Sequence, residues 1–222
     1  MRFAVLLSVL ALVVALTPAV AMAQTGACNQ PMAQPVAHVA LPGNPFEPIA
    51  TADGCWVFVT LAQQGGGAAA GAAGGAQGGV AVVRRGGGTA SLVRTVPLRG
   101  GPSGAVMTHD GKVLIVAAGQ LVAFLDVGRL ISGEGDAVLG YLDRGEPIGA
   151  IYANVTADDE FLFVSEERAA GILVVNLRNA RATGFTPSSI VGRIPVGNAP
   201  IALTFSADGR YLYTTSQSAL PA

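Results

Sequence analysis

Three features of this 222-residue sequence predict an all-β protein built from four-stranded antiparallel units. A proline stands eight residues before an Asp-Gly pair at Asp53-Gly54, Asp110-Gly111 and Asp208-Gly209. Each pair separates two apolar runs, which is the strongest short-range signal of a β-hairpin, with a type I′ turn expected. Two further strand candidates follow the first two hairpins. A four-stranded unit that recurs every ~40 to 50 residues is typical of a β-propeller blade.

A fourth, divergent copy of the repeat runs from Pro147 to Val164, with Asp158-Asp159 at its turn. It has three extra residues before the turn, which predicts either a bulged strand or a lengthened loop ahead of it. Residues 53, 110, 158 and 208 are therefore 57, 48 and 50 residues apart. The first spacing is long because of a Gly/Ala insert at 65–79, expected to be flexible. The predicted propeller, 41–222, divides into blades 41–98, 99–142 and 143–196 and a partial blade 197–222.

β-branched and aromatic runs predict the positions of the strands. Val113–Val116, Phe161–Val164 and Tyr211–Tyr213 are too continuously apolar for a half-exposed sheet, so they should be central strands covered on both faces. The remaining strand candidates are Val80–Arg85, Leu92–Leu98, Gln120–Val127, Val138–Leu142, Gly171–Leu177 and Ile190–Val196.

The first 23 residues predict a cleaved signal peptide. Met1-Arg2 precedes an apolar run at 3–16, and Ala21-Met22-Ala23 provides the small residues of a cleavage site. The alternatives are a retained membrane anchor, for which the run is short of the ~20 residues required, and a lipoprotein site at Cys28. Cleavage would place the protein in the periplasm or outside the cell, with no membrane segment afterwards.

Residues 24–40 form a lead ahead of the first blade. Within and just beyond it, Val36–Leu41 is similar to Ile194–Gly197 and is expected as a strand that closes the last blade. Export also allows Cys28 and Cys55 to form a disulfide, which would contribute about 3 kcal/mol by restricting the unfolded chain. Alternatively, Cys55 beside Trp56 is simply a small buried apolar residue.

Composition argues against a nucleic-acid partner. The formal net charge is -1, and Lys112 is the only lysine, so the chain has no basic face to neutralise phosphates. The glycine runs do not follow a strand and open a helix, so they are not phosphate-binding loops. No cofactor is expected.

The sequence contains no recognisable catalytic or metal constellation. His38 and His109 have no second ligand at metal spacing, and His109 is expected to be a solvated turn residue. No Gly-x-Ser-x-Gly nucleophile motif is present. The acids Asp158–Glu160 and Glu166-Glu167 flank one hairpin strand and can be read as a Ca²⁺ site or as a solvated loop.

Ligand-binding candidates come from the predicted architecture. The innermost strand of each blade starts beside the central channel, where converging polar groups form the default ligand site. Asn44 and Glu146 directly precede repeat prolines, at the predicted mouth of the channel. Glu47 and Asn198 lie next to these positions in the sequence. Asn44 and Asn198 can equally be turn residues that bond to their own backbone.

The run Val196–Thr215 resembles the YVTN-type β-propeller repeat, and Asp158–Glu166 followed by Gly171–Leu177 resembles the rest of such a blade. The similarity extends over Val39–Ser216. It implies a propeller of the kind found in surface-layer proteins, periplasmic YncE-like binding proteins and seven-bladed lactonases. The lactonase-like repeats tend to carry Arg-His after the proline. The corresponding pairs here are Phe46-Glu47, Ser103-Gly104, Ile148-Gly149 and Ile201-Ala202.

This departure favours an exported, non-enzymatic binding or interaction scaffold, with a protein partner or small ligand on its loop face. The alternative is a metal-assisted lactone hydrolase in which Glu47 or Glu146 helps to hold a divalent ion. A third hypothesis is a remnant without activity. About three and a half blades form an incomplete ring, as in a fragment or truncated product. The incomplete blade would expose a strand edge that favours self-association.

Overall fold

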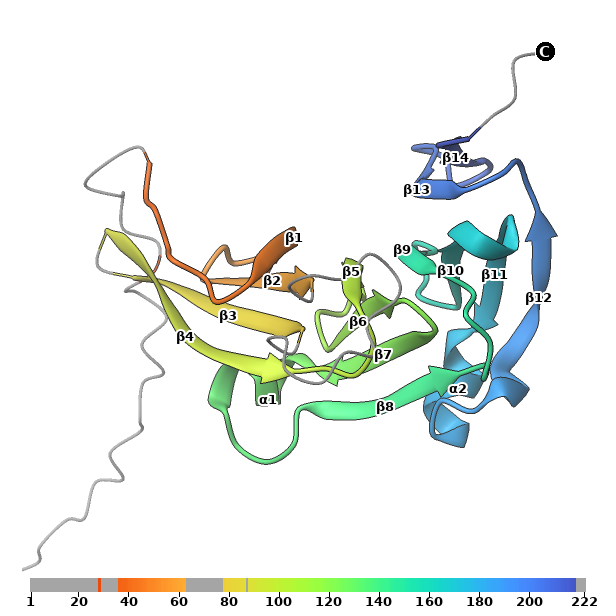
Figure 1. The fold of residues 1–222 in the computed structure, drawn as a ribbon. Coiled ribbons are helices and arrows are strands. Elements are labelled where there is room, and N and C mark those ends of the chain that lie inside the picture. The colour runs from red at the N-terminus through yellow and green to blue at the C-terminus, as the bar shows by residue number, and fades with distance from the viewer. Residues whose placement is uncertain (1–27, 29–35, 63–77, 87, 219–222) are drawn as a thin grey trace, which may run out of the picture.

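The computed structural model describes residues 28, 36–62, 78–86 and 88–218. In these residues the chain forms three four-stranded antiparallel sheets and one two-stranded sheet, and the strands of each sheet lie in chain order. The sheets follow one another along an open arc (Figure 1). The prediction of an incomplete ring of four-stranded propeller blades is confirmed.

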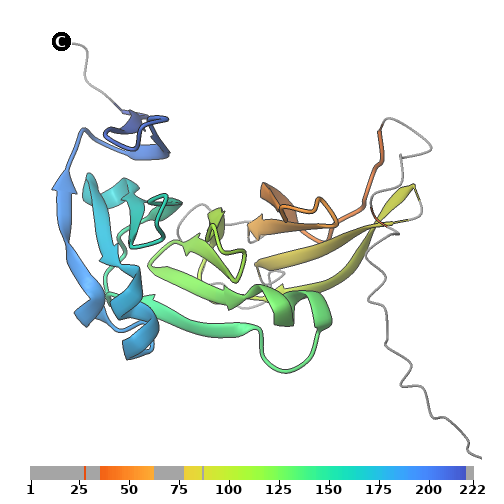
Figure 2. The same ribbon diagram turned by 180° about the vertical axis from the view of Figure 1, so that it is seen from behind.

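The first sheet is β1 (Asn44–Ala50), β2 (Trp56–Ala62), β3 (Gly79–Gly86) and β4 (Thr89–Pro97). The second is β5 (Pro102–Met107), β6 (Val113–Ala118), β7 (Leu121–Asp126) and β8 (Val138–Asp143). The third is β9 (Ala150–Val155), β10 (Phe161–Glu166), β11 (Gly171–Asn176) and β12 (Ile190–Pro195), and the fourth is β13 (Pro200–Phe205) and β14 (Leu212–Ser216). The first strands, β1, β5, β9 and β13, line the concave side of the arc, and β4, β8 and β12 lie on its convex side, as the reverse view also shows (Figure 2).

The core lies between neighbouring blades. Every residue of β6 is buried, as expected for a strand covered on both faces. Its alternate side chains belong to different clusters: Leu114 and Val116 pack with residues of the first blade, and Ile115 packs with residues of the third. Tyr211 and Tyr213 depart from this expectation, being 58% and 56% exposed, because their sheet has two strands among the described residues, of which only the third blade packs against it.

The hairpin turns differ from the predicted type I′. Gly111 has a φ of +68°, but Asp110 is not among the residues with positive φ, whereas type I′ needs it at both central positions. Instead, the Gly111 N–H donates to the Thr108 carbonyl at 2.8 Å. The Asp110 carboxylate accepts from the Thr108 hydroxyl at 2.6 Å and from the Lys112 N–H at 3.0 Å. The hydrogen bonds to the Asp110 carboxylate therefore stabilise the turn without a positive φ at Asp110.

The other three hairpins repeat this arrangement. A hydroxyl two residues before the aspartate donates to it, and the N–H two residues after it does the same. The pairs are Thr51 with Asp53, Thr156 with Asp158, and Ser206 with Asp208. The sequence signal is thus Thr/Ser-x-Asp rather than Asp-Gly alone.

Two short helices interrupt the blades between their third and fourth strands, α1 (Val127–Ser132) and α2 (Leu177–Thr183). Asp126 and Asn176 cap their N-termini, each accepting the N–H three residues on at 2.8 Å. Single 3₁₀ turns occur at Glu167–Ala169 and Pro187–Ser189. Within the described residues, no helix has the length and apolar character needed to cross a membrane.

The start of the chain is described only in part. The predicted signal peptide 1–23 and most of the lead and the Gly/Ala insert lie outside the described residues, and Gly79 of the insert begins β3. Residues 36–41 form no strand, and the last sheet has no third described strand with which they could pair, so the closing strand stays a prediction. Cys28 and Cys55 are joined by a disulfide, with their Cα atoms 5.2 Å apart.

The turn carboxylates predict how stability depends on pH. The Thr156 hydroxyl and the Glu160 N–H lower the pKa of Asp158 below its ordinary 3.8. The stabilisation is therefore present above pH 3.8 and is lost as the pH falls through the lowered pKa. We expect Asp158→Asn to lower the free energy of unfolding at pH 7, and the difference from wild type to shrink towards pH 2. Urea denaturation at both pH values measures this, with the exposed Glu134→Gln as the control; an equal difference at both would contradict the prediction.

Candidate functional site

Each inner strand has a β-bulge near its start, on the concave side of the arc. The register shifts between Pro45 and Pro48, between Pro102 and Ala105, and between Pro200 and Leu203. In the third blade, Ala150 rather than Pro147 pairs at the position of the repeat proline, opposite Glu166. The three extra residues therefore lengthen the loop before β9.

This register makes four residues equivalent, each two positions after the first of the bulge: Glu47, Gly104, Tyr152 and Ala202. Bulges re-aim side chains and are over-represented next to active sites. In three of the four blades a hydroxyl on the second strand accepts the N–H of that residue. The pairs are Thr60 with Glu47 at 3.0 Å, Ser165 with Tyr152 at 3.1 Å, and Thr215 with Ala202 at 3.2 Å.

Hydroxyls also connect neighbouring blades. The Ser165 hydroxyl donates to the Ile201 carbonyl of the fourth blade at 2.7 Å. Ser103 is buried, and its hydroxyl lies 3.1 Å from the Ala117 carbonyl and 3.4 Å from the Ala150 carbonyl of the next blade. These bonds fix the inner strands relative to one another, so the side chains at the bulges are positioned across blades.

Glu47 makes a direct contact between blades on the concave side. The part of this side formed by Phe46, Glu47, Gly104, Ala105 and Tyr152 is called the rim. Its Oε2 accepts the Ala105 N–H from β5 at 2.6 Å. Burial raises the pKa of the half-buried Glu47 carboxyl, and the Ala105 N–H opposes this. A carboxyl whose pKa is raised towards neutrality can act as an acid–base group.

An aromatic pair lies beside this carboxyl. The Phe46 and Tyr152 rings have centroids 5.7 Å apart and are tilted by 54°. Burial and the nearby Glu47 charge both raise the pKa of Tyr152. Gly104 makes room for the ring, since a Cβ there would lie 2.7 Å from Tyr152 Cδ1 and 2.5 Å from the Ile151 carbonyl oxygen. Residues of three blades therefore meet at one place.

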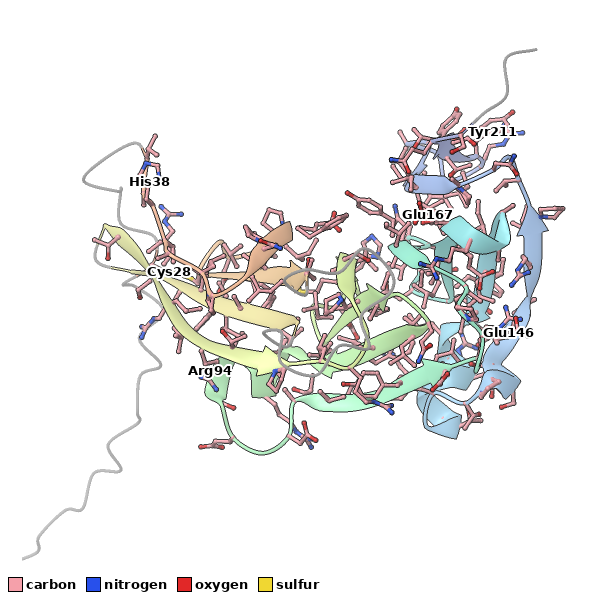
Figure 3. All side chains as sticks on the ribbon, in the orientation of Figure 1. Cys28, His38, Arg94, Glu146, Glu167 and Tyr211 are labelled. Atoms are coloured by element: carbon pink, nitrogen blue, oxygen red, sulfur yellow. A yellow bond between two sulfur atoms is a disulfide. The ribbon has the colours of Figure 1, made fainter. Side chains whose placement is uncertain are left out.

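The four predicted ligand residues do not come together. Glu47 lies at this rim. Asn44 and Asn198 are exposed in different blades, and the Asn198 carbonyl accepts the Ser216 hydroxyl. Glu146 is exposed in the loop before β9 (Figure 3). Tyr152 was not anticipated, because the lengthened loop displaced it from the repeat register; the bulge pairing is the signal that identifies it.

The acids proposed for Ca²⁺ are also separated. Asp158–Glu160 precede β10 and Glu166 ends it. Glu166 is fully buried between Arg144 and Arg193, with Oε1 3.4 Å from Arg144 Nη1 and Oε2 2.6 Å from Arg193 Nε. Among the described residues, no three His, Cys, Asp or Glu side chains are placed to hold a metal ion, so the donor set does not fit the divalent ion of the alternative hypothesis.

His109 is not merely a solvated turn residue. Its side chain is 57% exposed, yet Nδ1 lies 2.8 Å from Asp159 Oδ1 in the hairpin of the next blade. The same carboxylate oxygen accepts the His109 N–H at 3.0 Å. The contact links two blades on the hairpin side, near a cavity of about 310 Å³ that is bordered by the hairpins of the second, third and fourth blades.

The fold and this rim define an open-ring β-propeller with a carboxyl group on its concave side. Neither family models nor curated proteins match the chain. Among solved structures it is similar to the periplasmic gluconolactonase PpgL of Pseudomonas aeruginosa, at 17% identity and a TM-score of 0.63 over 81% of this chain and 52% of that one.

Two further structures share the fold. A putative 6-phosphogluconolactonase from Bacteroides fragilis is 20% identical, with a TM-score of 0.56 over 82% of this chain and 52% of its own. Hydrazine synthase of Kuenenia stuttgartiensis is 13% identical, with a TM-score of 0.55 over 75% and 54%. The chain thus spans about half the length of these proteins, and the likeness establishes the fold.

Gly104 should be intolerant of a side chain. Gly104→Val would push β5 against Ile151 and Tyr152, and we expect a loss of about 1–3 kcal/mol in the free energy of unfolding, as for other overpacked sites. Gly101→Ala is the matched control, since a Cβ there meets nothing within 4 Å. Urea denaturation of the two variants measures the difference; equal stabilities would contradict the packing described.

Glu166 should stabilise the fold through its two arginines. Glu166→Ala leaves both guanidinium groups without their buried partner, but Arg144 and Arg193 are 23% and 34% exposed and can be rehydrated. We therefore expect a loss of about 2 kcal/mol, below the usual cost of breaking a fully buried pair. Thermal and urea denaturation measure it, with Glu167→Ala as the control; a variant as stable as this control would refute the assignment.

Proposed function

We propose that this chain is part of a propeller that hydrolyses lactones, with Glu47 as its acid–base residue. The observation that carries the proposal is the Glu47 carboxyl, half-buried on the concave side, with a raised pKa and a hydrogen bond to the neighbouring blade. The likeness to a gluconolactonase and to a putative 6-phosphogluconolactonase supports this reading over a non-enzymatic scaffold.

The chemistry assigned to Glu47 is general-base catalysis. The ionised carboxyl takes a proton from a water molecule while the water oxygen attacks the lactone carbonyl carbon. The tetrahedral intermediate then breaks the bond between that carbon and the ring oxygen, and Glu47 returns the proton to the departing oxygen. The product is the open hydroxy acid. No redox partner is needed, because ester hydrolysis consumes only water.

The position of Glu47 bears on the missing Arg-His pair. The pair after the repeat proline is Phe46-Glu47 in the first blade, so a carboxyl and an aromatic ring occupy the place of the two basic groups. A base can therefore be supplied from the same point of the blade by a different side chain. This reading replaces the scaffold hypothesis as the one better supported.

We propose that the repeat is of the YVTN type and that the protein is periplasmic or secreted after loss of residues 1–23. The Cys28–Cys55 disulfide supports an oxidising compartment. Self-association through the exposed β13–β14 sheet, or a protein partner on the loop face, is proposed for the assembled form.

Activity should depend on Glu47. Glu47→Gln keeps the shape but removes the base, so we expect kcat/KM for D-glucono-1,5-lactone to fall by roughly 10²-fold or more. Acid release in a pH-stat, corrected for spontaneous hydrolysis, measures it, with Glu134→Gln as the control. In the wild type, kcat/KM should rise with pH as the Glu47 carboxyl ionises. The midpoint of this rise should lie above 4.5, the ordinary pKa of glutamate, since the pKa of Glu47 is raised.

Two results would count against this assignment. Wild-type protein that hydrolyses the lactone no faster than buffer would overturn the function. Activity that survives Glu47→Gln, but is abolished by a chelator and by Glu146→Ala, would favour the metal-assisted alternative.

A further inference from the structure

The inner strands carry almost no charge. β1, β5, β9 and β13 contain neither lysine nor arginine, and Glu47 is their single acidic residue. The inner strands of the concave rim therefore present one negative group and no positive one.

Two arginines in the adjoining loops have partners elsewhere. Arg99, before β5, lies over the Tyr141 ring of β8 at 4.1 Å from its centroid. Arg144, before β9, pairs with the buried Glu166. Neither arginine shifts the pKa of Glu47, which burial raises and the Ala105 N–H lowers. An anionic ligand placed at the Phe46–Tyr152 pair would meet the Glu47 carboxylate, and Arg99 and Arg144 are engaged elsewhere.

The apolar part of the rim is an aromatic wall. Phe46 is 42% exposed, and its ring is tilted against that of the partly buried Tyr152. Hydrogen bonds hold both residues, since Thr60 and Ser165 fix the bulges from which they project and Gly104 seats the Tyr152 ring. A preformed surface of two rings beside one hydrogen-bonding carboxyl suits the flat face of a small ring compound.

We propose that this rim binds an uncharged, ring-shaped ligand, with its face on the Phe46–Tyr152 wall and its polar edge at Glu47, and that it discriminates against anionic ligands. The choice of a lactone as this ligand rests on the proposed function. The selectivity itself follows from the charge of the inner strands. A sugar lactone without a phosphate is therefore preferred to its phosphorylated counterpart.

Binding tests this inference separately from turnover. D-Glucono-1,5-lactam, which resists hydrolysis, and its 6-phosphate differ by one phosphate group, and calorimetry on the full chain at low salt compares them. We expect the 6-phosphate to bind at least ten-fold more weakly than the lactam. This difference in affinity should narrow in Glu47→Gln, because the repulsion between the phosphate and the Glu47 carboxylate is removed. Phe46→Ala should weaken lactam binding at least five-fold. The exposed Tyr211→Ala should have no effect.

The outcomes separate the two proposals. Lactam binding with this selectivity but without lactone turnover would overturn the lactonase assignment and leave the ligand class standing. Turnover with equal or tighter binding of the phosphate would overturn the ligand class. Failure of the wild type to bind either compound, or lactam binding that is insensitive to Phe46→Ala, would also overturn it.

Discussion

Face-to-face packing of neighbouring blades is the constraint on which this structure depends. A strand such as β6 sends alternate side chains to opposite faces, so Leu114 and Ile115 must each find a different blade to cover them. A blade alone would expose both apolar faces. The arc of sheets is therefore the arrangement that buries both faces of each middle strand, and it also brings the inner strands close enough to exchange hydrogen bonds.

The candidate site is a consequence of that packing. The Glu47 carboxyl reaches the Ala105 N–H, and Tyr152 reaches the space above Gly104, only because the first three blades are pressed together. The bulges then turn these side chains to the concave side, and the hydroxyls of Thr60 and Ser165 satisfy the N–H groups that the bulges displace. The same contacts that complete the backbone hydrogen bonds thus pre-position an acid and an aromatic ring.

Charges are used differently on the two sides of the blades. On the hairpin side, turn aspartates bind hydroxyls and N–H groups, and Asp159 joins its blade to His109. At the other end of β10, Glu166 is buried against two arginines. In both arrangements the charged groups interact with other groups of the protein. Glu47 is the one carboxyl that the inner strands carry.

The sequence by itself determined the repeat, the strands and the fold class, because hairpin turns and apolar runs act through neighbours in the chain. It identified Glu47 as a candidate, but it could not single it out from Asn44, Glu146 and Asn198, since only packing decides which of these contacts another blade. It missed Tyr152, because a lengthened loop shifts the register that only backbone pairing reveals, and it mistook the turn type, because the Thr–Asp hydrogen bonds form only once the chain has turned. The tertiary structure decided the partners of His109 and Glu166 for the same reason: each interacts with residues distant along the chain, and such contacts depend on how the blades stack.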